Sequence, residues 1–139
     1  MTTAIDRTTA EHYIWGEVSE GWRLLDRADL SVIEERVPAG GAEEWHVHDQ
    51  ARQFFLILEG AAVMQTASGD VPLTAGQGCE ITAGQPHRFT NPSAAAVRFL
   101  VISSPTTRGD RRALPARDGV VSTNDNGREA EAPRPSFDA

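Results

Sequence analysis

The sequence predicts an all-β domain of the sandwich or barrel class, and three observations indicate it. Short runs rich in Val, Ile, Phe and Leu recur from Trp22 to about residue 103, as expected of β-strands. Clusters of Gly, Pro, Asp, Asn and Ser, which favour turns, separate these runs. No stretch keeps a helical period over three turns. Short strands at this spacing are typical of a closed or two-layered β structure.

Composition divides the chain into three parts. Residues 1–21 are expected to form a loosely ordered N-terminal arm, which Tyr13, Ile14 and Trp15 could attach to the body. Residues 22–104 form the predicted β-barrel. Its strands are expected near 22–27, 30–37, 43–48, 53–59, 61–66, 71–73, 78–81, 86–91 and 96–103.

The third part, residues 105–139, is predicted to be a flexible C-terminal tail. From 116 to 139 it contains no Leu, Ile or Met and one aromatic residue, Phe137. Such a segment buries too little apolar surface to offset its ordering entropy, so we expect it to be largely disordered from about residue 116.

The charge balance excludes several classes of partner. The net charge is −7, which argues against nucleic acid because phosphate binding needs clustered cations. Arg108, Arg111 and Arg112 form the only dense basic stretch, and we interpret it as a solvated loop.

No apolar run approaches the roughly 20 residues of a membrane span, and the start lacks a signal-peptide pattern. We therefore expect a cytoplasmic protein, and the use of Arg for all 13 basic residues suggests a bacterial source.

One predicted strand is apolar on both faces. It runs from Gln53 to Leu58 with the sequence QFFLIL, whereas a strand with one solvated face should alternate. One face should fill the barrel, and the other should be covered by the arm or by a second subunit. We expect a homodimer, because an exposed apolar stripe favours aggregation.

Three histidines predict a metal site. His46 and His48 are separated by one residue, so on a strand both side chains point to the same face. Gln53 opens the next strand and can return an oxygen toward the same point. His87 follows the turn 84–86, which could aim a third imidazole across the barrel. The set predicts one divalent ion, with positions open for substrate or water.

The residues around these histidines resemble the two motifs of the cupin superfamily. The first, G-x5-H-x-H-x3–4-E-x6-G, is matched by Gly40, His46, His48, position 53 and Gly60. The second, G-x5-P-x-G-x2-H-x3-N, is matched by Gly76, Gly84, His87 and Asn91. The resemblance covers residues 22–104 and implies a double-stranded β-helix, the cupin jelly-roll barrel.

The sequence departs from these motifs at two positions. Thr82 replaces the proline of the second motif, with little expected effect on function. Gln53 replaces the acidic ligand, so the resemblance implies a 3-His-1-Gln variant of the metal site. With a neutral amide the site keeps a charge near +2 by simple counting, which makes the ion a stronger Lewis acid. A degenerate, metal-free cupin stays open as an alternative.

The resemblance also narrows the expected chemistry. Cupins span isomerases, dioxygenases, decarboxylases and binding proteins, so the fold alone does not decide the function. Those with a 3-His-1-Gln set resemble isomerases, including one that opens unsaturated uronate rings. We therefore expect isomerisation, tautomerisation or ring opening of a small oxygenated anionic metabolite, with Fe, Ni, Zn or Mn as the metal. An Fe(II)-dependent dioxygenase or oxidase and a non-catalytic small-ligand-binding cupin remain alternatives.

Other residues are candidates for the reaction. Glu44 shares strand parity with His46 and His48 and is the candidate catalytic group for proton transfer. Glu34 or Glu35 could enter the cavity instead, according to strand register.

The candidates for substrate binding are two cations and two aromatic residues. Arg52 and Arg98 could bind a substrate carboxylate, and Phe55 and Phe89 could line the pocket.

Overall fold

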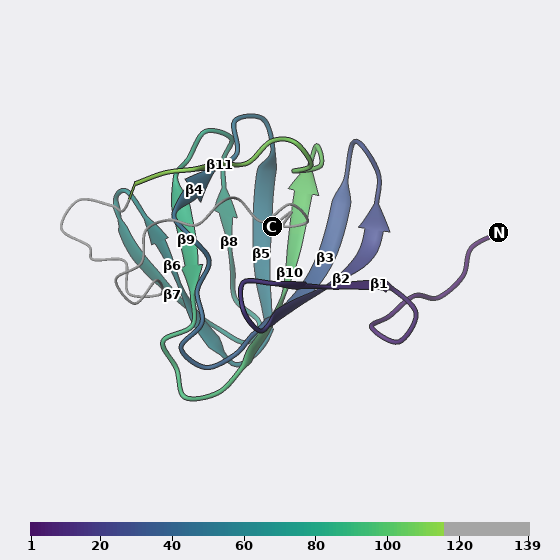
Figure 1. The fold of residues 1–139 in the computed structure, drawn as a ribbon, viewed down its shortest axis with the longest axis horizontal. Helices are drawn as coiled ribbons and strands as arrows, with labels where there is room; N and C mark the ends of the chain where they lie inside the picture. The colour runs from purple at the N-terminus through teal and green to yellow at the C-terminus, as the bar shows by residue number, and fades with distance from the viewer. Residues whose placement is uncertain (116–139) are drawn as a thin grey trace.

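The computed structural model describes residues 1–115. The expected disorder from about residue 116 therefore falls outside the described residues. Two antiparallel sheets enclose the core (Figure 1). The described part of the chain contains no helix, and therefore no helix that could cross a membrane.

Each sheet mixes strands from distant parts of the sequence. The larger sheet has, in order, β1 (Glu11–Trp15), β2 (Ser19–Asp26), β3 (Ser31–Val37), β10 (Val97–Ser104), β5 (Arg52–Glu59) and β8 (Gly78–Ile81). The smaller has β11 (Arg112–Ala113), β4 (His46–Val47), β9 (His87–Thr90), β6 (Ala61–Thr66) and β7 (Gly69–Thr74). The chain crosses repeatedly between the sheets, which makes the double-stranded β-helix that the motifs imply. The predicted fold class is confirmed.

The predicted barrel strands are found with small shifts of their ends, except that only His46–Val47 of the expected stretch 43–48 forms a strand. Two further strands lie outside the predicted ones. β1 forms within the expected loose arm and pairs with β2. Trp15 at its end is only 3% exposed. The sequence pattern missed β1 because an edge strand needs no regular apolar alternation. β11 lies beyond residue 104 and is too short to show a pattern.

The inner faces of both sheets form one apolar core. The rings of Phe89 and Phe99 stack with centroids 4.0 Å apart, and Phe55 lies 5.9 Å from Phe89. Gly60, the last glycine of the first motif, has φ +94° and packs so closely that a Cβ would lie 2.7 Å from the Ala96 carbonyl oxygen. The motif glycine is thus required by both backbone conformation and space.

The outer face of β5 stays partly open among the described residues. Phe54 and Leu58 are 42% and 37% exposed. The arm packs elsewhere, with the Arg7 guanidinium 5.6 Å from the centre of the Trp22 ring on β2. The N-terminal arm therefore does not cover the outer face of β5, and of the two expected possibilities a second subunit is left.

Candidate metal centre

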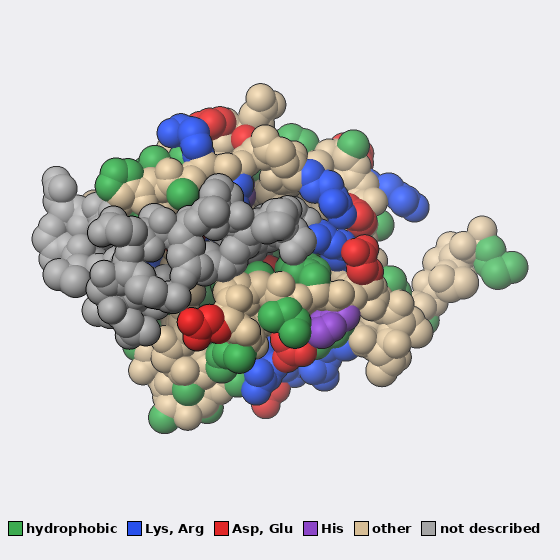
Figure 2. All heavy atoms as spheres, in the orientation of Figure 1, with side chains coloured by type: hydrophobic (Ala, Val, Ile, Leu, Met, Phe, Trp, Pro, Cys, Tyr) green, Lys and Arg blue, Asp and Glu red, His purple; other side chains and the backbone are tan. Residues whose placement is uncertain are grey.

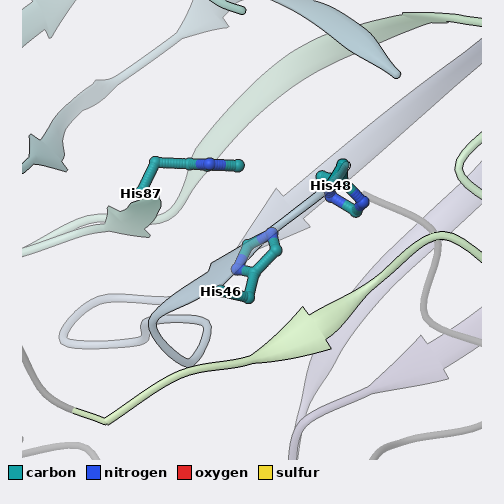
Figure 3. Close-up of side chains that lie close together, drawn as sticks. All are labelled: His46, His48 and His87. Carbon is teal, nitrogen blue, oxygen red and sulfur yellow. The ribbon is translucent and has the colours of Figure 1, made fainter. Parts of the chain in front are cut away.

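The three motif histidines meet inside the barrel. His46 on β4 stands directly opposite His87 on β9, and His48 follows two residues later on the same side. Their ligand-capable atoms all lie within 4.8 Å of one another, and each residue is at most 2% exposed. Figure 3 shows the three rings gathered together. We call His46, His48 and His87 the triad.

Each triad ring is oriented through its Nδ1 atom by a backbone carbonyl. The acceptors are Glu44 for His46 (2.8 Å), Asp110 for His48 (2.6 Å) and Gln85 for His87 (3.0 Å). A carbonyl only accepts, so in every ring Nδ1 carries the hydrogen. The neutral ring then keeps the Nε2 lone pair, the state in which histidine binds metals.

Burial keeps His46 and His87 neutral. Loss of solvent lowers the pKa of His87 to about 3, and together with the neighbouring charges it lowers the pKa of His46 well below the ordinary value. The Nε2 lone pairs of His46 and His87 are therefore available to a cation at neutral pH. The triad is compatible with binding one metal ion.

Gln53 completes the set of donors. It lies near the triad, on the core face of β5, and is 1% exposed. Its amide nitrogen donates to the Ser103 hydroxyl over 3.3 Å, while the buried Oε1 accepts no hydrogen bond within the described residues. A buried oxygen without a partner costs about 1–3 kcal/mol, and a bound cation would remove that cost. The donors therefore fit a 3-His-1-Gln metal site.

The turn before His87 contains the Thr-for-Pro departure. Gln85 Oε1 accepts the Thr82 backbone N–H over 3.0 Å, a bond that a proline could not donate. Gly84 has φ +79°, and its N–H donates to the His48 carbonyl over 2.7 Å. The departure thus replaces the stiffness of proline with a side-chain hydrogen bond.

The same Thr-Ala-Gly-Gln sequence occurs at 74–77, with the same bonds. Gln77 Oε1 accepts the Thr74 backbone N–H over 3.0 Å. The repeat is visible in the sequence and marks two turns of the same kind.

Residues 105–115 pass over the site, and we call this segment the strap. Its Asp110 carbonyl orients His48, and its carboxylate accepts the backbone N–H groups of Asp49, Gln50 and Ala51 over 3.0, 3.0 and 2.9 Å. β11, within the strap, pairs with β4. Sequence reasoning missed Asp110, because its role depends on a fold contact 62 residues away.

The solvated-loop interpretation of the basic stretch is right for two arginines and wrong for the third. The side chains of Arg108 and Arg112 are 48% and 61% exposed and pair with Asp26 and Asp49. The side chain of Arg111 is 9% exposed, and its Nη1 donates to the Glu44 carboxylate over 2.7 Å. Acidic and basic side chains are also interspersed on the face seen in Figure 2.

A second acid beside the triad was not predicted. Glu43 is 3% exposed, and its carboxyl accepts the Phe89 N–H over 2.9 Å and lies 4.0 Å from His46 Nδ1. Burial raises the pKa of Glu43 to about 8. Strand parity favoured Glu44 over Glu43, but that argument does not apply here because β4 begins only at His46.

The two arginines that were predicted to bind a substrate carboxylate lie away from the barrel interior. Arg52 and Arg98 are on the outer face of the larger sheet, where Arg52 pairs with Glu80 and Arg98 pairs with Glu34 and Glu59. The structure does not bring these arginines to the triad. Their substrate-binding role stays a prediction.

The remaining candidates are buried. Phe55 and Phe89 are in the core at 0% and 1% exposure, with the Phe55 ring centre 6.0 Å from that of His87. Glu35 is buried at 1% and accepts the Tyr13 hydroxyl over 3.1 Å.

Fold and site together define a jelly-roll barrel with a buried three-histidine centre. Residues 33–103, about half of the chain, match the family model described as Cupin_2, cupin domain. The chain belongs to the cupin family.

The curated relatives that match this chain are described as transcriptional regulators. The chain is 33% identical over 78 residues to the HTH-type transcriptional regulator PuuR of Escherichia coli strain K12, a match that covers 56% of this chain and 42% of PuuR. The chain thus spans about two-fifths of the length of the curated relatives it matches.

Solved structures with the same fold have varied descriptions. A sugar phosphate isomerase from a cupin superfamily of Silicibacter pomeroyi has a TM-score of 0.66 and 24% identity, with 76% of this chain and 77% of that chain covered. KdgF from Halomonas sp. has a TM-score of 0.69 and 12% identity, with 76% and 94% covered. The polyketide cyclase RemF of Streptomyces resistomycificus has a TM-score of 0.66 and 19% identity, with 89% of both chains covered. At these identities the likeness shows the fold alone.

Proposed function

We propose that this chain is a metal-dependent cupin enzyme that isomerises, tautomerises or ring-opens a small oxygenated anionic metabolite. The observation that carries the proposal is the buried, neutral donor set of three imidazoles and one amide oxygen. A carboxylate ligand would reduce the charge of the site, whereas this set leaves the full charge of a divalent ion to attract an anion.

In this proposal one ion is held by Nε2 of His46, His48 and His87 and by Oε1 of Gln53. Imidazole suits Fe, Ni and Zn, and a neutral oxygen also admits Mn. A divalent ion there supplies Lewis acidity, which stabilises negative charge that develops on substrate oxygens.

The residues around the triad have separate tasks in this proposal. Glu44, 12% exposed at its side chain, moves the proton between substrate carbons or oxygens. The buried rings of Phe55 and Phe89 exclude water from the inner side. Arg111 holds the Glu44 carboxylate in place before substrate binds.

Metal analysis and oxygen uptake test the proposal together. Protein purified without added metal is expected to contain about one divalent ion per chain, and candidate oxygenated acids should turn over under nitrogen as fast as in air. Stoichiometric iron with oxygen uptake that matches turnover would instead establish the dioxygenase alternative. The Gln53→Glu variant should bind metal at least as tightly and turn over more slowly; an unchanged rate would contradict a role for the neutral ligand.

One observation favours a second candidate, a small-ligand-binding module without catalysis. The relative at 33% identity is described as a transcriptional regulator, so a cupin domain of this sequence type occurs in a regulatory protein. Tight binding of a small acid with no chemical change, followed by NMR, would establish this function instead.

We also propose that the protein is a cytoplasmic homodimer that pairs through the outer face of β5. Phe54 and Leu58 on that face are 42% and 37% exposed. Light scattering should give twice the chain mass for the parent protein. It should give the chain mass for Phe54→Asp, and Val18→Asp, which changes another exposed apolar residue (63% exposed), should stay dimeric.

A further inference from the structure

Arg111 lies on the strap at the face that the triad occupies. The strap runs antiparallel to the segment that carries the histidines. The paired positions are Ala113 with His46 and Arg112 with Val47. Continued by one residue, this register places Arg111 opposite His48, and the bond from the His48 ring to the neighbouring Asp110 carbonyl agrees with it. Side chains at opposed positions share a face.

Exposure confirms that the two adjacent arginines point in different directions. The Arg112 side chain is 61% exposed, and the Arg111 side chain is 9% exposed. Arg111 Nη1 donates to the Glu44 carboxylate over 2.7 Å, and the backbone carbonyl of the same glutamate accepts the His46 Nδ1–H over 2.8 Å. The guanidinium is therefore bound to a residue that itself contacts the triad.

The charges around the proposed ion do not balance. A divalent ion on neutral ligands adds two positive charges and Arg111 adds one. Glu44, its partner at 2.7 Å, adds one negative charge, and the Glu43 carboxyl, 4.0 Å from His46 Nδ1, adds at most one more. Buried charge that is not compensated is costly. A chelating monoacid supplies one negative charge, and a substrate with a second anionic group brings another to the guanidinium.

We propose that Arg111 docks a second anionic group of the substrate, a carboxylate or phosphate, while the first end of the substrate chelates the metal. Glu44 is the internal counter-ion that this second group displaces from the guanidinium. The planar fork of arginine matches both oxyanions. This inference rests on the proposed metal site, and it makes Arg111 the residue that selects dianionic substrates.

Three probes with the same chelating 2-hydroxy acid test it. Lactate has no second anionic group, malate has a carboxylate, and 3-phosphoglycerate has a phosphate. Each is titrated into cobalt-loaded protein and followed by the visible absorption of the ion. The parent protein should bind malate, 3-phosphoglycerate or both about 10- to 100-fold more tightly than lactate, the range of one charged hydrogen-bonded pair. The favoured probe identifies the anionic group.

Three variants separate docking from a structural role. Arg111→Gln should reduce the preference over lactate to about 1, and Arg112→Gln, the matched control, should keep it. Glu44→Gln removes the competitor and should tighten the binding of the favoured dianion. If Arg111 only holds Glu44, the Glu44→Gln variant will show no gain, and the inference is overturned.

Failure of the inference differs from failure of the proposed function. Suppose that lactate changes the cobalt spectrum, and that the parent protein and Arg111→Gln prefer malate or 3-phosphoglycerate over lactate to the same degree. This result overturns the docking role alone. Absence of cobalt binding overturns the metal site and the docking role with it, and bound cobalt whose spectrum none of the three probes changes overturns the docking role while the metal site stands.

Discussion

The triad contains two kinds of histidine, and they differ in how the ring is oriented. His46 and His87 each donate to a carbonyl two residues earlier in the chain. His48 donates to Asp110, 62 residues later. The first two positions are built by their own local segments, and the third depends on the strap. Of the three rings, only that of His48 is therefore oriented directly by the strap, and metal binding should be coupled to the strap mainly through this ligand.

Removal of a triad histidine should have the largest effect on metal affinity, whether its ring is oriented locally or by the strap. Loss of a residue that only orients a ligand costs about 10- to 100-fold in metal affinity. The variants His46→Ala, His48→Ala and His87→Ala remove a ligand itself, so each should lose more metal affinity than that. Metal content after dialysis against a weak chelator measures this. His12→Ala, which changes an exposed histidine paired with Glu20, should keep full content, and retention by all three ligand variants would refute the assignment.

Low pH should lower the folding stability of the metal-free protein, because His46 and His87 are buried as neutral rings. The folded pKa of His87 is about 3, and that of His46 is also far below its ordinary value. The unfolded chain therefore binds more protons below about pH 6.5, and folding stability falls as the pH drops from there. Glu43, with a folded pKa of about 8, has the opposite sign between about pH 4.5 and 8.

The sum of these groups gives a stability maximum for metal-free protein near pH 6.5. Two histidines against one acid leave a slope of about 1.4 kcal/mol per pH unit below it. Urea unfolding between pH 4.5 and 8 measures the curve. Glu43→Gln should remove the decline above pH 6.5, and a parent curve that rises steadily to pH 8 would contradict these assignments.

The difference between the histidines also explains what the sequence could predict. The spacing of His46 and His48, the turn before His87 and the motif glycines are local features, and they were sufficient for the fold class and the triad. Asp110 and Arg111 act through contacts made only when the strap lies along β4. Within the sequence they are part of an arginine-rich loop, and nothing local separates Arg111 from Arg112. Burial alone separates them.

The strap contact gives the next prediction. Asp110→Ala removes the carboxylate that accepts the three backbone N–H groups of residues 49–51, so the loop after His48 should loosen and metal affinity should fall about tenfold. Asp26→Ala breaks the exposed pair between the barrel and Arg108 and should leave affinity unchanged. Isothermal titration with zinc measures both, and equal affinities in the two variants would contradict the coupling through His48.

The smallest effect should come from the paired Thr-Ala-Gly-Gln turns. Gln85→Ala and Gln77→Ala each remove a side-chain oxygen that accepts two bonds from the threonine at the start of the turn. Both should cost about 1 kcal/mol of folding stability, measured by urea unfolding. Only the turn at 82–85 leads into His87, whose ring it orients through the Gln85 carbonyl. Zinc affinity should therefore fall a few-fold for Gln85→Ala and stay unchanged for Gln77→Ala; an equal loss in both would show that the turn stabilises the barrel without positioning the ligand.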